Sequence, residues 1–306
     1  MNISAIVVIG VSAGGMEPLF ELVEGIPEDC QATFFVVQHI PAHAESNLHL
    51  ILASHTLLTV SAADDQLPFQ PGHIYTACSD RHLLVEEGRM AVAKGPRENH
   101  FRPSVDALFR SAAYAYRDRV IGVVMSGALN DGTSGMWAIK NFGGVSIIQS
   151  REEAVFDSMP KSVADYVELD YELPSREIGP MINRLTQQAI AVTSQKTDLV
   201  TNEKFTAFEI NVAKGKNALE RGVLEFGTFS PLACPESHGA LTEYCAGGLK
   251  RRGDGTSGCQ KYGQCSQSPL HRLAPEGHRW GNLLARRGFG PPPEAGQFRS
   301  NDTAYR

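Results

Sequence analysis

The stretch from Ile9 to Gly15, which reads Ile-Gly-Val-Ser-Ala-Gly-Gly, limits the possible folds more than any other part of the sequence. An apolar run at 5–8 precedes it, with the length and the β-branched residues of a buried strand. The residues after it, 16–25, place apolar side chains at helical spacing. A strand that passes through a glycine-rich turn into a helix is typical of open α/β sheets, whose sites lie at the carboxyl ends of the strands. Ser12 is therefore expected at a helix N-terminus, where backbone amides favour developing negative charge, and it is a candidate nucleophile.

A phosphate-binding loop is the common alternative for such a turn. The pattern here is Gly-x-x-x-Gly-Gly, however, and it lacks both the Gly-x-Gly-x-x-Gly fingerprint and the Lys-Ser/Thr pair of a P-loop. A dinucleotide site would also place an acidic residue after the next strand, to bind ribose. The strand expected at 33–37 is followed instead by Gln38-His39. His39 suits a general base for Ser12 better than a ribose ligand, so a nucleotide-binding domain is the less favoured hypothesis.

The alternation of strand and helix patterns along the chain predicts the fold class. Further strands are expected at 120–125 and 145–148, and helices at 104–116, around 136–139, at 159–167 and at 175–187. Short strands at 73–77, 83–85 and 90–92 are expected to form a small antiparallel excursion at the sheet edge. This order implies an α/β fold with a doubly wound, mostly parallel sheet and helices on both faces.

Composition and charge exclude several classes of protein. With 306 residues, 42% of them hydrophobic and 20% charged, the chain can bury a full core. It has no apolar run long enough to cross a membrane and no cleavable leader, and its six cysteines are widely spread, so we expect a reduced, cytoplasmic protein without membrane insertion. The net charge is −6, and residues 1–250 are the acidic part, which argues against nucleic acid as the main partner.

Three residues with complementary chemistry are expected at the carboxyl ends of three strands: Ser12, His39 and Asp131. In a parallel sheet these ends share one edge, so the three can converge although they are far apart in sequence. Their types match a nucleophile, a general base and an orienting carboxylate. Each has a plainer alternative: Ser12 could cap a helix, His39 could be an ordinary edge histidine, and Asp131 could be a turn residue in Asn-Asp-Gly. The hypothesis rests on all three occurring together.

At these residues the sequence resembles the catalytic domain of the CheB family of chemotaxis protein-glutamate methylesterases. The resemblance covers 1–187 and consists of five motifs in the order of the family: Ile9 to Gly15, Val37-Gln38-His39, Arg102 to Phe109, Ser126 to Gly132, and Val155 to Pro160. The chain departs from the family at Ala13, where threonine is common, and at Ala128-Leu129, where Met-Gly is common.

The resemblance implies a Ser12–His39–Asp131 triad that hydrolyses glutamyl methyl esters on methyl-accepting chemotaxis receptors, with glutamine deamidation as a second activity. The activity that the resemblance implies requires no cofactor or metal. Backbone amides at Ala13 and Ala128 are the expected oxyanion donors, and Arg102 is a candidate for contact with the receptor. No attached receiver domain is expected. The alternative function is a non-catalytic module of the same fold that binds receptors or a chemotaxis methyltransferase.

The C-terminal third departs from the alternating pattern. We expect the catalytic domain to occupy 1–187 and to fold without the rest. Residues 188–246 are expected to be a polar linker, with one helix at 217–225, and an extension that resembles a degenerate zinc module. In it Ser237 stands where a second cysteine would complete Cys-Pro-x-Cys, which makes metal binding unexpected. Residues 247–306 are expected to form a basic, poorly ordered tail.

Overall fold

The computed structural model describes residues 5–187, 199–215, 228–233, 240–244 and 262–265. Its main feature is a seven-stranded sheet in the order β3-β4-β2-β1-β7-β8-β9, in which all neighbouring strands run parallel. The strands of this sheet are β1 (Ile6–Val11), β2 (Thr33–Gln38), β3 (Thr59–Ala62), β4 (His73–Thr76), β7 (Val120–Val124), β8 (Val145–Gln149) and β9 (Tyr171–Leu173). The predicted α/β class and the mostly parallel sheet are confirmed.

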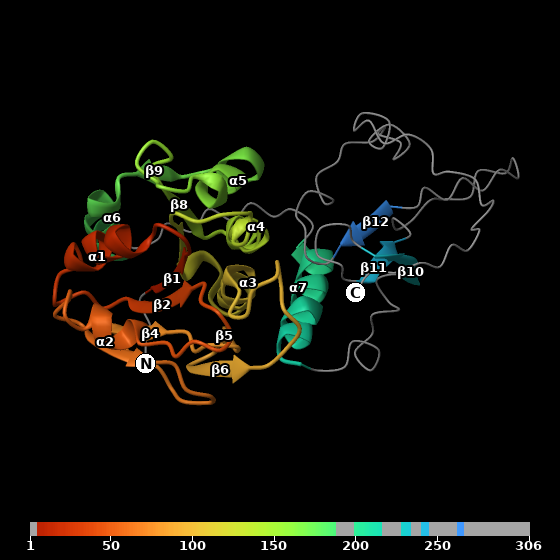
Figure 1. Cartoon of the computed structure of the whole chain (residues 1–306), viewed down its shortest axis with the longest axis horizontal. Helices are drawn as coiled ribbons and strands as arrows, with labels where there is room; N and C mark the ends of the chain where they lie inside the picture. The colour runs from red at the N-terminus through yellow and green to blue at the C-terminus, as the bar shows by residue number, and fades with distance from the viewer. Residues whose placement is uncertain (1–4, 188–198, 216–227, 234–239, 245–261, 266–306) are drawn as a thin grey trace, which may run out of the picture. The chain divides into compact units, whose positions relative to one another are not determined.

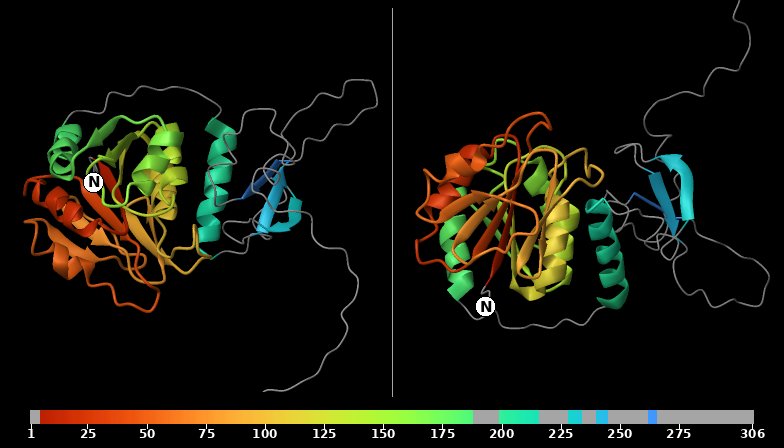
Figure 2. Two further views of the ribbon diagram at one scale, coloured as in Figure 1. Left: turned by 45° about the horizontal axis from the view of Figure 1, so that its top comes forward. Right: turned by 90° about the horizontal axis from the view of Figure 1, so that it is seen from below.

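Helices cover both faces of this sheet (Figures 1 and 2). One face packs against α1 (Met16–Glu24), α2 (Leu48–Leu52) and α6 (Ser175–Gln187), and the other against α3 (Val105–Tyr116), α4 (Thr133–Asn141) and α5 (Ser158–Tyr166). Alternate residues of β1 enter the two cores: Val7 and Ile9 face the first group of helices, and Ile6 and Val8 face the second. This full burial on both faces explains why the strands read as continuous apolar runs.

The order of the strands fixes where a site can form. Within the sheet, β2 lies beside one edge of β1, and the chain later returns to place β7 beside the other edge. Such a switch point leaves a crevice at the carboxyl ends of the strands. Helix α3 lies close to β1 there. A β-carbon added to Gly10 of β1 would lie only 2.3 Å from the Val105 side chain of α3. The residues that follow β1, β2 and β7 therefore meet at one place.

The region of the predicted antiparallel excursion differs from the prediction in one respect. An antiparallel pair does occur, but it consists only of β5 (His82–Glu86) and β6 (Arg89–Ala93). The strand at His73–Thr76 was expected in the same excursion, yet it pairs in parallel with β2 and β3 and belongs to the main sheet. A strand of four residues is too short for its sequence to show the direction of its partner, so the predicted antiparallel pairing of this strand was wrong.

The structure adds elements beyond residue 187. Helix α7 (Leu199–Ala213) spans a stretch where we expected a linker, and it packs against α3. A separate antiparallel sheet consists of β10 (Thr228–Ala233), β11 (Ala240–Tyr244) and β12 (Tyr262–Cys265). The helix expected at 217–225 and most of the tail expected at 247–306 lie outside the described residues.

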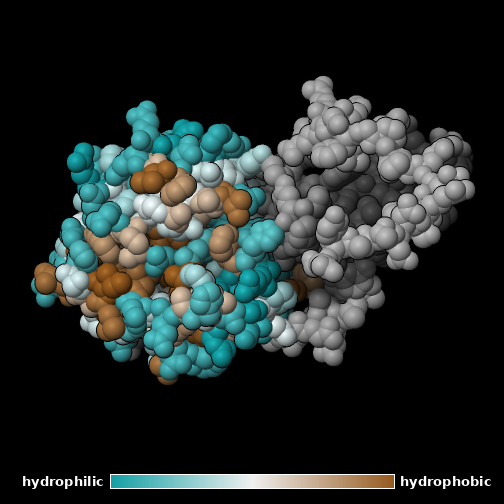
Figure 3. Space-filling model, viewed as in Figure 1, coloured by the Kyte–Doolittle hydropathy of each residue, from teal (hydrophilic) through white to brown (hydrophobic). Residues whose placement is uncertain are grey.

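The described surface is largely hydrophilic, with separate apolar patches on the face that Figure 3 shows. Large exposed apolar side chains occur on and around α2, with Leu50, Ile51 and Leu57, and in two loops after β7 and β8, with Leu129, Val155 and Phe156. No helix in the described part of the chain has the length and apolar character needed to cross a membrane.

Candidate active site

Ser12 follows β1 directly and begins the turn into α1. Its backbone amide donates to the Ser126 carbonyl at 2.9 Å, which ties the turn to the loop after β7. Gly14 has a φ of 69°, a left-handed conformation that favours glycine, and it lies against the Val155 side chain. Gly127 also approaches closely, because a β-carbon there would lie 2.8 Å from that of Ser12. Small residues therefore leave the Ser12 side chain room at the sheet edge.

His39 follows β2 and lies between the other two predicted residues. Its Nδ1 is 3.1 Å from Ser12 Oγ, and its Nε2 is 2.8 Å from Asp131 Oδ2. The Phe101 ring stacks on the imidazole with 3.6 Å between ring centroids and 6° between planes. The His39 side chain is 3% exposed. The arrangement suits the tautomer that carries its proton on Nε2, since this nitrogen faces a carboxylate and leaves Nδ1 to accept from the serine hydroxyl.

Asp131 is fully buried in the loop between β7 and α4. Its two oxygens accept five hydrogen bonds, from His39 Nε2 (2.8 Å), Asn99 Nδ2 (3.0 Å), Ser104 Oγ (2.9 Å), and the backbone amides of Val105 (2.8 Å) and Asp106 (3.0 Å). Burial alone would raise the pKa of Asp131, but the hydrogen bond and charge of His39, with the other donors, outweigh it and lower that pKa to about 2. The carboxylate is thus held ionised beside the imidazole.

A second buried carboxyl group, Asp106, lies behind Asp131 at the start of α3. Its Oδ1 accepts from the backbone amides of Gly132 (3.0 Å) and Gly135 (2.6 Å), and its Oδ2 accepts from Asn99 Nδ2 at 2.7 Å. Burial and then the charge of Asp131 raise the pKa of Asp106 to about 8, against the opposing effects of Arg110 and the Gly135 amide. Sequence reasoning assigned no role to Asp106 or Asn99.

The predicted oxyanion donors lie in the two turns beside Ser12. The Ser12 amide is occupied by Ser126, and the Gly127 amide donates to the Phe156 carbonyl at 2.9 Å. Ala13 and Ala128 are the residues that follow these two in the chain, and both reach the surface: Ala13 is exposed and Ala128 is half-buried. Their use as oxyanion donors stays a prediction.

Arg102 lies in the loop before α3 and is held by its own neighbours. Its guanidinium pairs with Asp80 and donates to the Gly95 carbonyl at 2.7 Å. A hydrogen bond from Lys94 and then those from Arg102 lower the pKa of Asp80 to about 2. These bonds give Arg102 a structural role in the loop, and its contact with a substrate stays a prediction.

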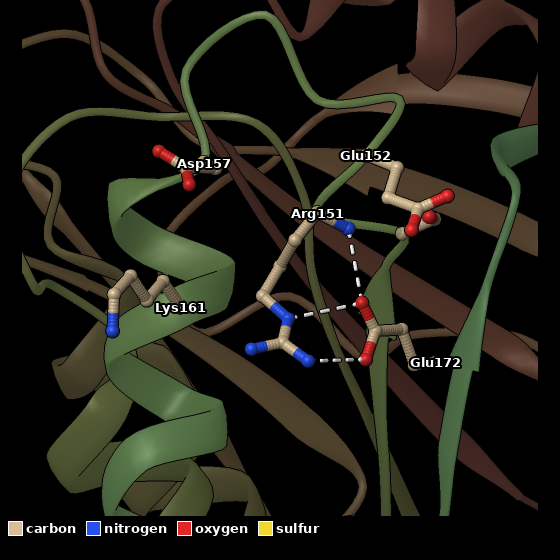
Figure 4. A pocket seen from close by; sticks show the side chains of 6 residues that line it. Arg151, Glu152, Asp157, Lys161 and Glu172 are labelled. Atoms are coloured by element: carbon tan, nitrogen blue, oxygen red, sulfur yellow. Dashed lines mark hydrogen bonds and ion pairs between the residues drawn. The ribbon is translucent and has the colours of Figure 1, made fainter.

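An open polar hollow of about 610 Å³ lies beside the loop that follows β8. Arg151, Glu152, Asp157, Lys161 and Glu172 line it (Figure 4), and Arg151 forms a bidentate pair with Glu172 at 3.0 Å. Lys161 pairs with Asp165 on its own helix. None of the three predicted triad residues lines this hollow.

The described ranges contain no group of three or more His, Cys, Asp or Glu that could hold a metal ion. The Cys234-Pro235 pair and Ser237, on which the zinc-module comparison rests, lie outside the described residues.

Taken together, the geometry can activate a serine hydroxyl. A hydroxyl, an imidazole and a buried carboxylate form one hydrogen-bonded line, with the nucleophile at the outer end and the carboxylate at the inner end. An arrangement of this kind serves acyl transfer through a covalent intermediate.

Comparisons with known proteins point to one family. The family model described as CheB methylesterase matches residues 7–182. A protein of Leptospira interrogans is 34% identical over 188 residues, which cover 61% of this chain and 97% of that protein. The protein-glutamate methylesterase/protein-glutamine glutaminase of Thermotoga maritima is 36% identical over 177 residues, and there the match covers 56% of this chain but only 52% of the relative.

Among solved structures, the crystal structure of the Thermotoga maritima CheB methylesterase catalytic domain is similar, with a TM-score of 0.57 and 35% identity. The likeness covers 59% of this chain and 98% of that domain. Sequence and structure therefore point to the same region, which contains all three predicted triad residues.

Proposed function

This chain belongs to the CheB methylesterase family, and we propose that it is a serine esterase that hydrolyses glutamate methyl esters on methyl-accepting chemotaxis receptors. The family match ends at residue 182, so the proposed activity resides in the part of the chain that forms the seven-stranded sheet and its helices. The observation that carries the proposal is the hydrogen-bonded line of Ser12, His39 and Asp131.

The proposed reaction begins at the Ser12 hydroxyl. His39 takes the Ser12 proton on Nδ1 while Oγ attacks the ester carbonyl, and Asp131 stabilises the imidazolium that forms. His39 then gives this proton to the departing methoxide, so methanol leaves and the glutamyl group stays on Oγ as an acyl-enzyme. Water attacks this intermediate with His39 again as base, which releases glutamate and restores Ser12.

In the proposed reaction, the backbone amides of Ala13 and Ala128 donate to the developing oxyanion. One such donor is typically worth about 3 kcal/mol in the transition state. Because the donor is a backbone group, the departure from the family at Ala128 keeps this function, while the departure at Ala13 removes only a side-chain hydroxyl.

Two further features belong to the proposal. The same acyl chemistry can act on a glutamine side chain, with ammonia as leaving group, and relatives carry the glutaminase name as well. The exposed apolar side chains of Leu129, Val155 and Phe156 lie in the loops beside Ser12, where a receptor helix would contact the site. The alternative, a non-catalytic module that binds receptors or a methyltransferase, would not need an intact nucleophile–base–carboxylate line.

The test is methanol release from receptor membranes methylated beforehand. We expect release by the wild-type chain and a loss of about 10³-fold or more in Ser12→Ala, because removal of the nucleophile abolishes the covalent path. Ser54→Ala, at an exposed position on the C-terminal side of α2, is the matched control and should keep the wild-type rate. Release that is absent from the wild type, or equal in folded Ser12→Ala, would refute the esterase and favour the binding module.

A further inference from the structure

A two-residue turn before α3 lies directly behind the proposed triad. Glu98 and Phe101 exchange backbone hydrogen bonds of 3.1 and 2.8 Å, and the two residues between them, Asn99 and His100, have φ values of 48° and 70°. Positive φ at both central positions is the geometry of a type I′ hairpin turn, and asparagine tolerates it better than most residues. The turn directs the Asn99 side chain into the protein, where the residue is 6% exposed.

Two residues of this turn contact the triad. Asn99 Nδ2 donates to Asp131 Oδ1 at 3.0 Å, and Phe101 stacks on the imidazole of His39. The same Asn99 nitrogen donates to Asp106 Oδ2 at 2.7 Å. An amide nitrogen carries two hydrogens, so a single uncharged group can satisfy one oxygen of each buried carboxyl and separate the two.

The turn is also fixed at its base. Glu98 forms a buried ion pair with Arg110 of α3, whose Nε lies 3.6 Å from Glu209 Oε2 of α7. A buried charged pair of this kind holds its backbone in one place, since moving either partner would leave a charge unmatched. Asn99 is therefore presented to Asp131 by a turn that has little freedom to shift.

We propose that Asn99 is a positioning residue for catalysis, which holds Asp131 in line with His39 while Phe101 holds the imidazole by stacking on its face. The side-chain hydrogen bonds of Asn99 go to Asp131 and Asp106 and not to Ser12 or His39, so Asn99 acts through Asp131. The inference rests on the proposed esterase function, but the arrangement it describes can be tested without activity.

The experiment compares Asn99→Gly with His100→Gly in the full chain. Glycine accepts the left-handed backbone at both positions, so each variant should keep the turn. Only Asn99→Gly removes the side-chain amide that donates to Asp131. Misplacement of a catalytic group by about 1 Å can cost 10²-fold in rate. We therefore expect kcat of Asn99→Gly to fall about 100-fold with KM within twofold of wild type, and His100→Gly to keep both within twofold.

A spectroscopic measurement distinguishes positioning from a merely structural role. The His39 Nε2–H proton that faces Asp131 should give a low-field proton resonance, which should move or broaden in Asn99→Gly and stay in place in His100→Gly. Asn99→Asp, which places an acceptor where the donor stood, should perturb the resonance at least as much.

The outcomes separate the two levels of the proposal. An unchanged resonance and unchanged kcat in both Asn99 variants, with only a lower melting temperature, would overturn the positioning role. If the wild type releases no methanol but the resonance moves in Asn99→Gly, the esterase function fails and the positioning of Asp131 stands.

Discussion

The carboxyl edge of the sheet and the contact between α3 and α7 both bury charged groups, but they hold them in different ways. At the sheet edge, Asp131 accepts two of its five hydrogen bonds from backbone amides in the first turn of α3. Between α3 and α7, by contrast, Arg110 meets Glu98 and Glu209 through side chains alone. The first arrangement draws in part on backbone groups whose positions the start of α3 fixes. The second depends on the side chain of Glu209, which lies in α7.

This difference separates the residues that should set the reaction rate from those that should set the free energy of unfolding. The line from Ser12 to Asp131 is complete within residues 12–131 and within the family match. The Glu98–Arg110 pair that fixes the neighbouring turn also lies outside α7, so we expect the site to form without this helix. The contact of α7 instead places Glu209 beside the buried Arg110 and buries Ala213, the last residue of α7. Changes at the sheet edge should therefore reduce the rate, and changes at α7 should reduce the free energy of unfolding.

The largest effect is expected from Asp131→Asn. The amide would present a donor to groups that are themselves donors and would favour the wrong imidazole tautomer, a change that costs about 10⁴-fold in kcat in serine proteases. Steady-state methanol release at saturating receptor measures it. A rate within about tenfold of wild type would mean that Asp131 serves only to cap the neighbouring backbone.

The next prediction concerns the pH dependence of stability at the same edge. The pKa of Asp106 is raised to about 8, so between about pH 4 and pH 8 the unfolded chain has lost this proton while the folded chain keeps it. The free energy of unfolding should then fall as pH rises through this window. Asp131 acts in the opposite sense: its pKa of about 2 adds stability that is lost as pH falls from about 4 to 2.

Asp106→Asn tests this assignment, because it removes the titrating group. Urea unfolding of both proteins at a series of pH values should show the variant gaining relative to wild type as pH rises from 4 to 8. A difference between the two that does not change with pH would show that Asp106 has no such raised pKa.

The α7 contact offers a matched pair of glutamates on one helix. Glu209 faces the buried Arg110, whereas Glu203 pairs with the half-exposed Arg117 at 2.8 Å. We expect Glu209→Gln to lower the free energy of unfolding by about 2 kcal/mol, because the buried Arg110 loses one of its two opposing charges. Glu203→Gln should cost about 0.5 kcal/mol or less, since exposed pairs contribute little. Equal losses in urea unfolding would remove the distinction between the two pairs.

The smallest effect on rate is expected from truncation. A chain that ends at Gln187 keeps every strand of the main sheet, and we propose that it folds with kcat within twofold of the full chain but melts at a lower temperature, because Arg110 loses Glu209. Thermal melting and methanol release by the two chains side by side measure both quantities. A chain that fails to fold, or whose kcat collapses, would place the domain boundary beyond α7.

The sequence predicted the parallel sheet and the convergence of Ser12, His39 and Asp131, because buried strands are apolar runs and their ends share an edge. It did not predict α7. Among the residues of that helix whose burial the structure describes, the buried positions are Thr206, Glu209, Ile210 and Ala213. They repeat at helical spacing but are half polar, so hydrophobicity shows no stripe.

Asn99 was missed for a different reason. It lies in a loop without periodicity, and its contacts are to residues 7 and 32 positions away. The only local signal is an asparagine in a short polar turn, which is common in loops of every kind. Long-range hydrogen bonds to a buried carboxylate can be found only once the chain is folded.

The most direct test of the central claim is a double-mutant cycle on methanol release with Ser12→Ala, His39→Ala and the double variant. Residues that act as one catalytic unit are non-additive, so the account predicts that the double variant is no slower than either single variant. Losses that multiply, so that the double variant is slower by the product of the two single effects, would contradict a Ser12–His39 unit joined by its 3.1 Å contact.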